Sequence, residues 1–465
     1  MRDIMKRLIG DRNFYRKVFS VLLPILIQNL ITNFVSLLDN IMVGQVGTEP
    51  MSGVAIVNQL LFVYNLCALG GLSGAGILTA QYFGKGDHDG IRYTIRVKLL
   101  ISGIIFFVFG GLLITYGKNM ILLFLHEGSE GLDLAVTLHY GEEYLHVMLL
   151  QLLPFVVTMM YASTLRETGE TLLPMKAGIA AVLVNLVFNY ILIFGKLGAP
   201  ALGVVGAAIA TVLARFVEML LVVTWTHRHT ERNRFIVGVF RSLKVPRSVL
   251  RQVVLLGMPL LFNELLWSGG MTALNQCYSL RGLEVVSAMN ISSTVSNLFF
   301  SAFIATGNAT SILIGQLLGA GETDRAIDED RKLIFFALML SLGVGVLMAG
   351  SASVFPQIYN TTEAVKNLAR SILLIGAAMM PLHAFANSCY FTLRSGGKAL
   401  ITFAFDSGSI WLLNIPVAFV LSRFTAGPIL QMYLIIELLN LVKCVVGYVL
   451  VKRKTWVKNL VADPA

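Results

Sequence analysis

The chain of 465 residues is 56% hydrophobic and only 13% charged, with a formal net charge of +10. Soluble globular domains carry about 25% charged residues, so this composition excludes that class. Most of the 36 Lys and Arg lie before the first apolar run or after every second one. This is the positive-inside pattern of a membrane protein, so the basic charge does not indicate a nucleic-acid partner.

Apolar runs of about 20 residues, the length that crosses a hydrocarbon core as an α-helix, follow one another along the chain. Twelve are present, at residues 18–40, 52–80, 97–117, 136–160, 172–194, 203–225, 250–279, 285–313, 333–354, 365–391, 399–422 and 428–451. The alternating pattern of an outer-membrane β-barrel is absent from the sequence. We therefore expect an all-α integral protein of the cell membrane with twelve transmembrane helices and both termini in the cytoplasm.

The first predicted helix carries a polar stripe that ends at Asp39. Spacings of three and four residues place Asn29, Thr32 and Ser36 on the same face as this carboxylate. A polar face within lipid should line a bundle interior or a wet cavity, and a mid-membrane carboxylate costs about 2.5–3.5 kcal/mol on insertion scales. Asp39 is therefore a candidate functional residue, and the alternative is that it caps the outer end of the helix at the membrane interface.

The end of the second predicted helix contains a motif that the chain repeats. Residues 74–89 recur as residues 309–324, and both copies contain Gln-x-x-Gly-x-Gly, starting at Gln81 and at Gln316. No strand precedes either copy, so the glycines indicate tight turns and close helix packing rather than a nucleotide-binding loop.

A second repeated motif, Thr-Leu-Arg, starts at residue 164 and again at residue 392. Two markers in the same order indicate that the chain consists of two duplicated halves. We expect an N-terminal six-helix bundle at 1–226 and a C-terminal six-helix bundle at 251–465. The basic cytoplasmic linker between them, 227–250, should partly form an amphipathic surface helix.

Two amides stand out on the fifth predicted helix. Asn185 and Asn189 lie four residues apart and therefore on one face. Thr211 adds a hydroxyl on the sixth helix. The amides could be interhelical hydrogen-bonding groups worth about 0.6–2 kcal/mol. Together with Asp39 they could instead supply oxygen ligands to a hard cation such as sodium.

The second half has polar stripes of its own. Glu264 is its strongest charged candidate, with a structural ion pair as the alternative, and Asp406 could reach toward a partner on the inner side. His383 could act in a proton relay or be a structural core histidine. The polar residues of the seventh and eighth helices that are candidates for lining a cavity are Ser268, Asn275, Asn290 and Asn297.

Four motifs, in this order, carry a family resemblance. They are Leu-Asp-Asn-Ile-Met-Val-Gly at 38–44, Gln-x-x-Gly-x-Gly at 81–86, Thr-Leu-Arg-Glu-Thr-Gly-Glu-Thr at 164–171 and Leu-Arg-Ser-Gly-Gly at 393–397. Over nearly its whole length the chain resembles the multidrug and toxic compound extrusion (MATE) transporters. The resemblance implies two pseudo-symmetric six-helix bundles around a central cavity. It also implies antiport of organic, cationic drugs against sodium or protons.

The resemblance also assigns residues to a coupling site in the first half. Asp39 matches the family's acidic residue on helix 1 that binds the coupling cation, Asn185 matches an Asn of that site, and Thr211 matches a site hydroxyl. Asn189 stands where several members have Asp. If sodium is the coupling ion, Asp39, Asn185 and Asn189 are its expected ligands.

In the second half, the resemblance identifies Glu264 with the helix 7 Glu of sodium-coupled members. His383 stands where some members have Asp. At the spacing of the repeat, Asp39 corresponds to Leu274, so the proposed cation site is not duplicated although the scaffold is.

The expected function is export of drugs by alternating access, driven by sodium or protons, with no enzymatic activity and no cofactor other than the coupling ion. The expected partners are a small-molecule substrate and membrane lipid, and we expect a monomer. One alternative is a lipid-linked oligosaccharide flippase of the same superfamily, which a cavity rich in Arg and Lys would favour. Another is a polytopic membrane enzyme, which would need clustered His, Asp or Ser near one surface.

Overall fold

The computed structural model describes residues 8–125, 133–359, 361–425 and 427–462, without the side chains of Ser36, Leu37 and Asn40. Within these ranges the chain consists of helices and connecting turns, with no β-strand. Twelve helical stretches are long and apolar enough to cross a membrane, which confirms the predicted number of spans.

The first-half helices follow the predicted runs, with one span built from two helices. α5 and α6 form a single candidate span across a 3₁₀ turn at Leu149–Gln151. The helices are α2 (Arg12–Gly44), α3 (Thr48–Lys85), α4 (His88–Phe124), α5 (Leu134–Met148), α6 (Leu152–Glu167), α7 (Leu172–Phe194) and α8 (Gly203–Arg228).

The second-half helices also follow the predicted runs. The eleventh span is interrupted by a π-helical turn at Ile410–Asn414, which ends two residues before Pro416; proline has no N–H and cannot continue the helical hydrogen bonds. The helices are α9 (Arg247–Ser279), α10 (Leu283–Gly319), α11 (Thr323–Ser351), α12 (Glu363–Ser395), α13 (Ala399–Ser409), α14 (Ile415–Phe424), α15 (Ile429–Leu438) and α16 (Asn440–Lys452).

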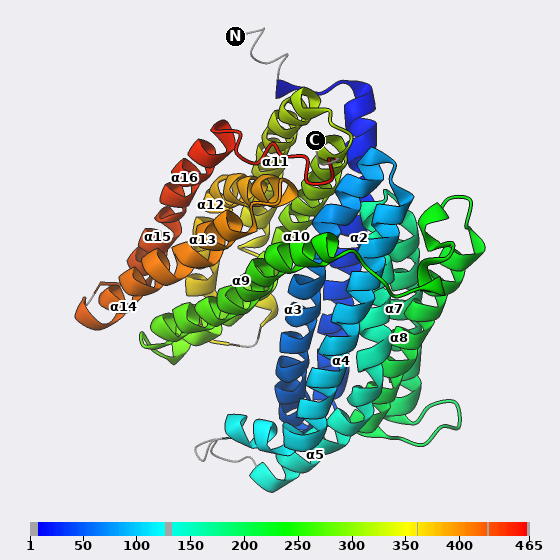
Figure 1. Ribbon diagram of the computed structural model, residues 1–465. Helices are drawn as coiled ribbons and strands as arrows, with labels where there is room; N and C mark the ends of the chain where they lie inside the picture. Colours follow the sequence, from blue (N-terminus) through cyan, green and yellow to red (C-terminus); the bar gives the residue numbers. More distant parts are fainter. Residues whose placement is uncertain (1–7, 126–132, 360, 426, 463–465) are drawn as a thin grey trace. The chain divides into compact units, whose positions relative to one another are not determined.

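These helices, most of which Figure 1 labels, pack into two compact units. Unit 2 contains residues 27–79 and 88–253, and unit 1 contains residues 254–465 together with 1–26 and 80–87. The start of α2 and the last turns of α3 therefore pack with the second half of the chain. The boundaries at 226 and 251 remain a prediction about the duplicated halves.

The apolar start of α2 shows why it belongs to unit 1. Val18, Leu22 and Ile25 recur at helical spacing and are buried in one core cluster. This cluster also contains Leu313 of α10 and Trp456, which follows α16. Burying the stripe against these residues stabilises the unit by the hydrophobic effect, at about 25 cal/mol per Å² of apolar surface.

The linker between the halves does not form the predicted amphipathic helix. It contains two 3₁₀ turns, at Arg234–Ile236 and Val239–Arg241, on either side of Gly238, whose φ of 77° ends a right-handed helix. Arg96 of α4 donates to the carbonyl oxygens of Val239 (2.9 Å) and Lys244 (3.0 Å). The linker backbone is thus bound by an arginine side chain instead of by helical hydrogen bonds.

The repeated motifs end four helices in the same way. Gly86 and Gly321 have φ values of 78° and 79°, and Gly169 and Gly397 have values of 87° and 72°. After each helix the glycine N–H and the following N–H donate back to carbonyls of the last turn, as in Asp87 N to Tyr82 O at 2.9 Å. This is the Schellman cap, which favours glycine because its left-handed conformation crowds a Cβ atom.

The same motif lets two helices cross backbone to backbone within unit 1. A Cβ atom on Gly84 of α3 would lie 1.8 Å from the carbonyl oxygen of Gln316 on α10. Reciprocally, a Cβ atom on Gly319 would lie 1.9 Å from the carbonyl oxygen of Gln81. The glycine of each copy therefore packs against the glutamine backbone of the other copy. This symmetric contact accounts for the recurrence of both residues.

Candidate functional site

Four polar residues predicted to act together lie together in unit 2. Asp39 of α2 accepts a 2.6 Å hydrogen bond on Oδ1 from Nδ2 of Asn189 on α7. The same Asn189 nitrogen donates to Oδ1 of Asn185 at 3.1 Å, and Nδ2 of Asn185 donates to the hydroxyl of Thr211 on α8 at 3.2 Å. The arrangement is a continuous polar chain across three helices, starting at a carboxylate.

The amide of Asn185 fits this place in two orientations. With its nitrogen and oxygen exchanged, Nδ2 donates to Oδ1 and Oδ2 of Asp39 at 2.8 and 3.2 Å, and Oδ1 accepts from Thr211 at 3.2 Å. The first orientation instead places the amide oxygen against the carboxylate. Two acceptor oxygens at that distance need a proton or a cation between them. The orientation of Asn185 is therefore linked to the charge of Asp39.

One oxygen of the cluster has no hydrogen-bond partner among the described residues. Oδ1 of Asn189 is buried and unpaired, in a side chain that is only 1% exposed. Leaving a buried amide oxygen unpaired costs about 1–3 kcal/mol. The Asp39 carboxylate, the Asn185 oxygen and the Thr211 hydroxyl are the other oxygens of the cluster. The Asn189 amide turns its nitrogen toward Asp39 and Asn185, so a rotation of that amide would add its oxygen to the set. Such a set fits a hard cation such as sodium, or a proton shared between oxygens.

Local sequence explains why α7 and α8 bring these groups together. Ala181, Asn185 and Asn189 are buried at four-residue spacing and form one stripe of α7. On α8, a Cβ atom at Gly206 would lie 2.6 Å from the carbonyl oxygen of Leu192, so only glycine permits this approach. The two helices lie side by side in Figure 1, and their close approach places Thr211 within reach of Asn185.

Two further polar side chains lie near the carboxylate. Arg215 of α8 and Tyr144 of α5 are within electrostatic range of Asp39. Arg215 is itself paired with Glu218 at 2.8 Å, and the Tyr144 hydroxyl donates to Asn58 at 3.3 Å. The charge of Arg215 is thus balanced by Glu218, and among the described residues Asp39 has no ion pair of its own.

The second-half candidates belong to two different polar groups. Nε2 of His383 lies 2.7 Å from Oε2 of Glu437 on α15, a carboxylate that the sequence analysis did not single out. Glu264 is partly buried and lies within electrostatic range of Arg394 and Asp406. The structure thus gives each of the two candidates its own neighbours, and they do not share a hydrogen bond.

Asp406 has the ion-pair partner that its position in an apolar helix requires. Oδ1 of Asp406 lies 2.6 Å from Nζ of Lys443 on α16, and Oδ2 accepts from Asn263 at 3.1 Å. Asn263 is buried and also bonds Ser407. Asn263 was missed because a single amide next to Glu264 gives no pattern in the sequence. Asp406 and Lys443 could have been paired, since both are formal charges within predicted spans.

The cavity-lining candidates have different exposures. On α2, Asn29 is partly exposed and Thr32 is exposed, while the side chain of Ser36 lies outside the described residues. In the second half Ser268 is partly exposed, and the exposed candidates are Asn275, Asn290 and Asn297.

A second buried polar group of unit 2 was also missed. Nζ of Lys98 on α4 lies 2.6 Å from Oε2 of Glu167 on α6 and also donates to the hydroxyls of Ser163 and Thr164. Lys98 is fully buried. A Cβ atom on Gly76 of α3 would lie 2.4 Å from Oε1 of Glu167, so this glycine makes room for the pair.

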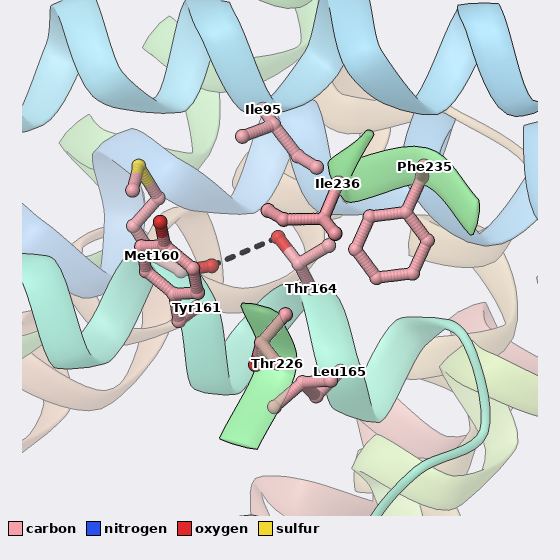
Figure 2. A pocket seen from close by; sticks show the side chains of 8 residues that line it. All are labelled: Ile95, Met160, Tyr161, Thr164, Leu165, Thr226, Phe235 and Ile236. Carbon is pink, nitrogen blue, oxygen red and sulfur yellow. Dashed lines mark hydrogen bonds between the residues drawn. The ribbon is translucent and has the colours of Figure 1, made fainter. Parts of the chain in front are cut away.

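A small cavity next to this group has a different character from the Asp39 cluster. It lies between α4, α6, α8 and the linker, and apolar side chains such as Ile95, Leu165 and Phe235 line it (Figure 2). Its Thr164 hydroxyl is occupied by a 2.8 Å hydrogen bond to the Met160 carbonyl. None of the predicted site residues borders the cavity.

Comparison with known proteins gives consistent results along the chain. Residues 24–191 and 259–420 match the family model described as MatE. The chain is similar to "Probable multidrug resistance protein NorM" of Thermotoga maritima, with 23% identity over 412 residues, 88% of this chain and 86% of the relative. It is also similar to "Probable multidrug resistance protein YoeA" of Bacillus subtilis, with 25% identity over 425 residues, 90% of this chain and 89% of the relative.

Among solved structures, the fold is similar to one described as the outward-facing conformation of a multidrug resistance MATE family transporter of the MOP superfamily. The TM-score is 0.86 at 19% identity, and the match covers 97% of each chain. At this identity the likeness concerns the fold, and it confirms the expected twelve-helix architecture.

Proposed function

The chain belongs to the MatE family of transporters, and on this premise we propose that it is an antiporter that exports organic cations in exchange for sodium or protons. Relatives named as multidrug resistance proteins support the export of drugs. The chain is a multi-pass membrane protein. The positive-inside distribution of Lys and Arg supports its placement in the cell membrane with both termini in the cytoplasm.

The coupling step is assigned to Asp39 and rests on one observation. The partly buried carboxylate lies against the buried amides of Asn185 and Asn189, and the Asn189 amide has an unpaired oxygen that a rotation of the amide would turn toward Asp39. A buried negative charge without a balancing cation is costly, so the cluster favours binding of a proton or a sodium ion at Asp39. Sodium would be held by oxygens of Asp39, Asn185 and Asn189, with Thr211 beside them.

Neutralising Asp39 would rearrange hydrogen bonds on α7 and α8. An ionised carboxylate accepts from the Asn185 nitrogen, and a protonated one can donate to the Asn185 oxygen. When Asp39 is ionised and accepts from the Asn185 nitrogen, the Asn185 oxygen faces Thr211, so the Thr211 hydroxyl must donate to it. In the other orientation of Asn185 this hydroxyl donates to the Ala207 carbonyl at 3.0 Å. A hydroxyl has one proton to donate. Binding a cation at Asp39 therefore changes which bond Thr211 makes, which carries the change into α8.

In the proposed cycle, the coupling cation enters from outside and binds at Asp39, and the altered packing of unit 2 releases the drug. The return step exposes the site to the inside, where the cation leaves. Alternating access of this kind is a rearrangement of the halves of a duplicated fold around a site near the midplane. Because one chain supplies both halves, we propose that the protein acts as a monomer.

Export of an organic cation from proteoliposomes tests the proposal, with sodium and proton gradients imposed separately. Asp39→Asn should reduce gradient-driven export to the level of empty vesicles while the protein is still produced and folded. Glu284→Gln, which changes an exposed carboxylate in the first turn of α10, is the matched control and should export like the wild type. Unchanged export by Asp39→Asn contradicts the assignment, and the gradient that drives the wild type identifies the coupling ion.

The flippase alternative receives less support. Recognition of an anionic lipid-linked sugar would need unpaired basic groups within the membrane. Three Lys and Arg of the candidate spans are instead paired with carboxylates, Lys98 with Glu167, Arg215 with Glu218 and Lys443 with Asp406. Membership of a transporter family likewise argues against a polytopic membrane enzyme.

A further inference from the structure

The coupling site does not use the repeated Gln-x-x-Gly-x-Gly motif, and the structure gives one copy of it a second role. Beyond α16 the chain continues through Trp456 to the end of the described residues at 462. This C-terminal tail is not a solvated end: Trp456 is 1% exposed and Val461 is 5% exposed. The tail crosses the ends of α3, α10 and α12 within unit 1.

Gln81 is the centre of this contact. Its Nε2 donates to the carbonyl oxygens of Ser395 (3.1 Å) and Lys458 (3.2 Å), and its Oε1 accepts from the N–H of Leu460 (2.7 Å). Both amide protons and the amide oxygen are therefore used, in a side chain with 0% exposure.

Further contacts fix the tail on both sides of Gln81. Nζ of Lys85 on α3 donates to the carbonyl oxygen of Val461 at 2.9 Å. Nδ2 of Asn459 donates to the carbonyl oxygen of Gly319 at the end of α10 at 3.3 Å. Directly after α12, a Cβ atom at Gly396 would lie 1.8 Å from the carbonyl oxygen of Trp456, so the tail backbone rests directly on a glycine.

The helices joined in this way come from both halves of the chain. α10 and α12 belong to the second half, whereas α3 belongs to the first, and the division between the compact units falls inside α3 after Thr79. The tail therefore binds the last turns of a first-half helix to second-half helices. In the other copy of the motif, the Gln316 carbonyl faces Gly84, while the tail contacts involve Gln81.

We propose that residues 456–461 form a strap that holds the end of α3 against α10 and α12, and that the strap leaves Gln81 each time the transporter opens at this end. The inference rests on the alternating-access mechanism proposed above. The positive-inside pattern assigns this end, with Lys85 and Lys458, to the cytoplasm. The strap would thus favour the state that is closed to the cytoplasm, and breaking it would favour opening there.

A single cysteine at the end of the tail reports release of the strap. Val461→Cys replaces a buried side chain and keeps the backbone groups that bind Lys85 and Asn459. The four native cysteines are buried, so they form a slowly reacting background. With a water-soluble maleimide, we expect slow labelling in the resting protein and about tenfold faster labelling when Gln81→Leu is added. Gln276→Leu, an exposed glutamine on α9, is the control and should leave the rate unchanged.

Two more variants separate loss of the strap from loss of the fold. Gln81→Glu keeps an acceptor for Leu460 but loses both donated bonds, so its labelling rate should lie between those of the wild type and Gln81→Leu. Truncation after Val457 keeps the buried Trp456 and removes Lys458, Leu460 and Val461. We expect the truncated protein to fold and to label a cysteine placed at the buried Ser395, beside Gln81, faster than the full chain does.

A cross-link tests whether release is required for transport. A cleavable bismaleimide between Lys85→Cys and Asn459→Cys should stop export, and cleavage should restore it. Export at the unlinked rate by fully cross-linked protein overturns the proposal, as does equal labelling of Val461→Cys in the Gln81→Leu and Gln276→Leu backgrounds. If the wild type exports no cation, the proposed function fails, whereas the labelling arm still decides whether the tail is held by Gln81.

Discussion

The crossing of α3 and α10 makes a quantitative prediction about two glycines. In Gly84→Ala the new Cβ atom would lie 1.8 Å from the Gln316 carbonyl oxygen, and Cβ contacts below 3.0 Å essentially do not occur. The helices must therefore move apart by at least 1.2 Å, the difference between these two distances. The clashing atom belongs to the backbone, so no side-chain rotation relieves the contact.

The expected loss follows from two opposing effects. Overpacking a well-packed contact costs about 1–3 kcal/mol, and a backbone clash belongs at the upper end of this range. Alanine regains up to about 1 kcal/mol because it favours a helix more than glycine does. The net loss for Gly84→Ala should be about 2 kcal/mol, and the symmetric contact predicts a similar loss for Gly319→Ala.

The matched control is Gly343→Ala on α11. A Cβ atom there meets nothing within 4 Å, so only the gain in helix propensity remains, up to about 1 kcal/mol. The two single variants at the crossing should not be additive, because once the helices have separated the second alanine meets less resistance. Unfolding by dodecyl sulphate, followed by circular dichroism, measures the change in unfolding free energy for Gly84→Ala, Gly319→Ala, the double variant and Gly343→Ala. If Gly84→Ala unfolds at the same dodecyl sulphate concentration as Gly343→Ala, the crossing is not the tight contact described here.

Two further predictions concern the buried charges of unit 2. Asn189→Asp places a second carboxylate beside Asp39, and if sodium is a ligand we expect about tenfold tighter sodium binding, or about 1.4 kcal/mol, by isothermal calorimetry; unchanged affinity argues against sodium at this site. Lys98→Met leaves Glu167 buried without its cation and should cost about 3–5 kcal/mol of unfolding free energy, whereas Lys98→Met with Glu167→Gln should recover most of it. A double variant as unstable as the single one contradicts that account.

The architecture could be predicted because it depends on features that are local in sequence. Each span is an apolar run longer than the hydrocarbon core is thick, and nothing in the fold is needed to recognise it. The cluster of Asp39, Asn185 and Asn189 could also be predicted from the sequence, because a formal charge in a span and two amides at four-residue spacing are rare. Their proximity is now observed, while their role in coupling remains a prediction.

The missed groups depend on which helices meet. Lys98 begins an apolar run and looks like an interfacial lysine, and only the approach of α6 turns it into half of a buried ion pair. Glu437 gains its significance from His383, which lies on another helix. The tail beyond α16 is short and basic, which in the sequence indicates only an inner terminus. Its function as a bound segment follows from Gln81, hundreds of residues earlier in the chain.

The repeated motif was predicted to be a shared fold device, and the structure separates two properties within it. The glycines have the same roles in both copies. Gly86 and Gly321 end their helices in a left-handed conformation, and Gly84 and Gly319 allow the backbone of the other helix to approach closely. The glutamine of the first copy has a further contact, because the side chain of Gln81 holds the C-terminal tail. A duplicated chain has only one C-terminus, so a contact with it cannot be symmetric.

The same reasoning links the strap to the coupling site through the chain itself. Asp39 lies on α2, and Gln81 on α3, and each of these helices begins in one compact unit and ends in the other. Along α2 the hydrogen-bond ladder is interrupted at Pro24, just before the division between the units, so displacement is carried mainly by α3. A change of packing at Asp39 in unit 2 therefore has a covalent, helical route to the contacts of unit 1. The cation and the strap would then act on the same equilibrium from opposite ends of these two helices.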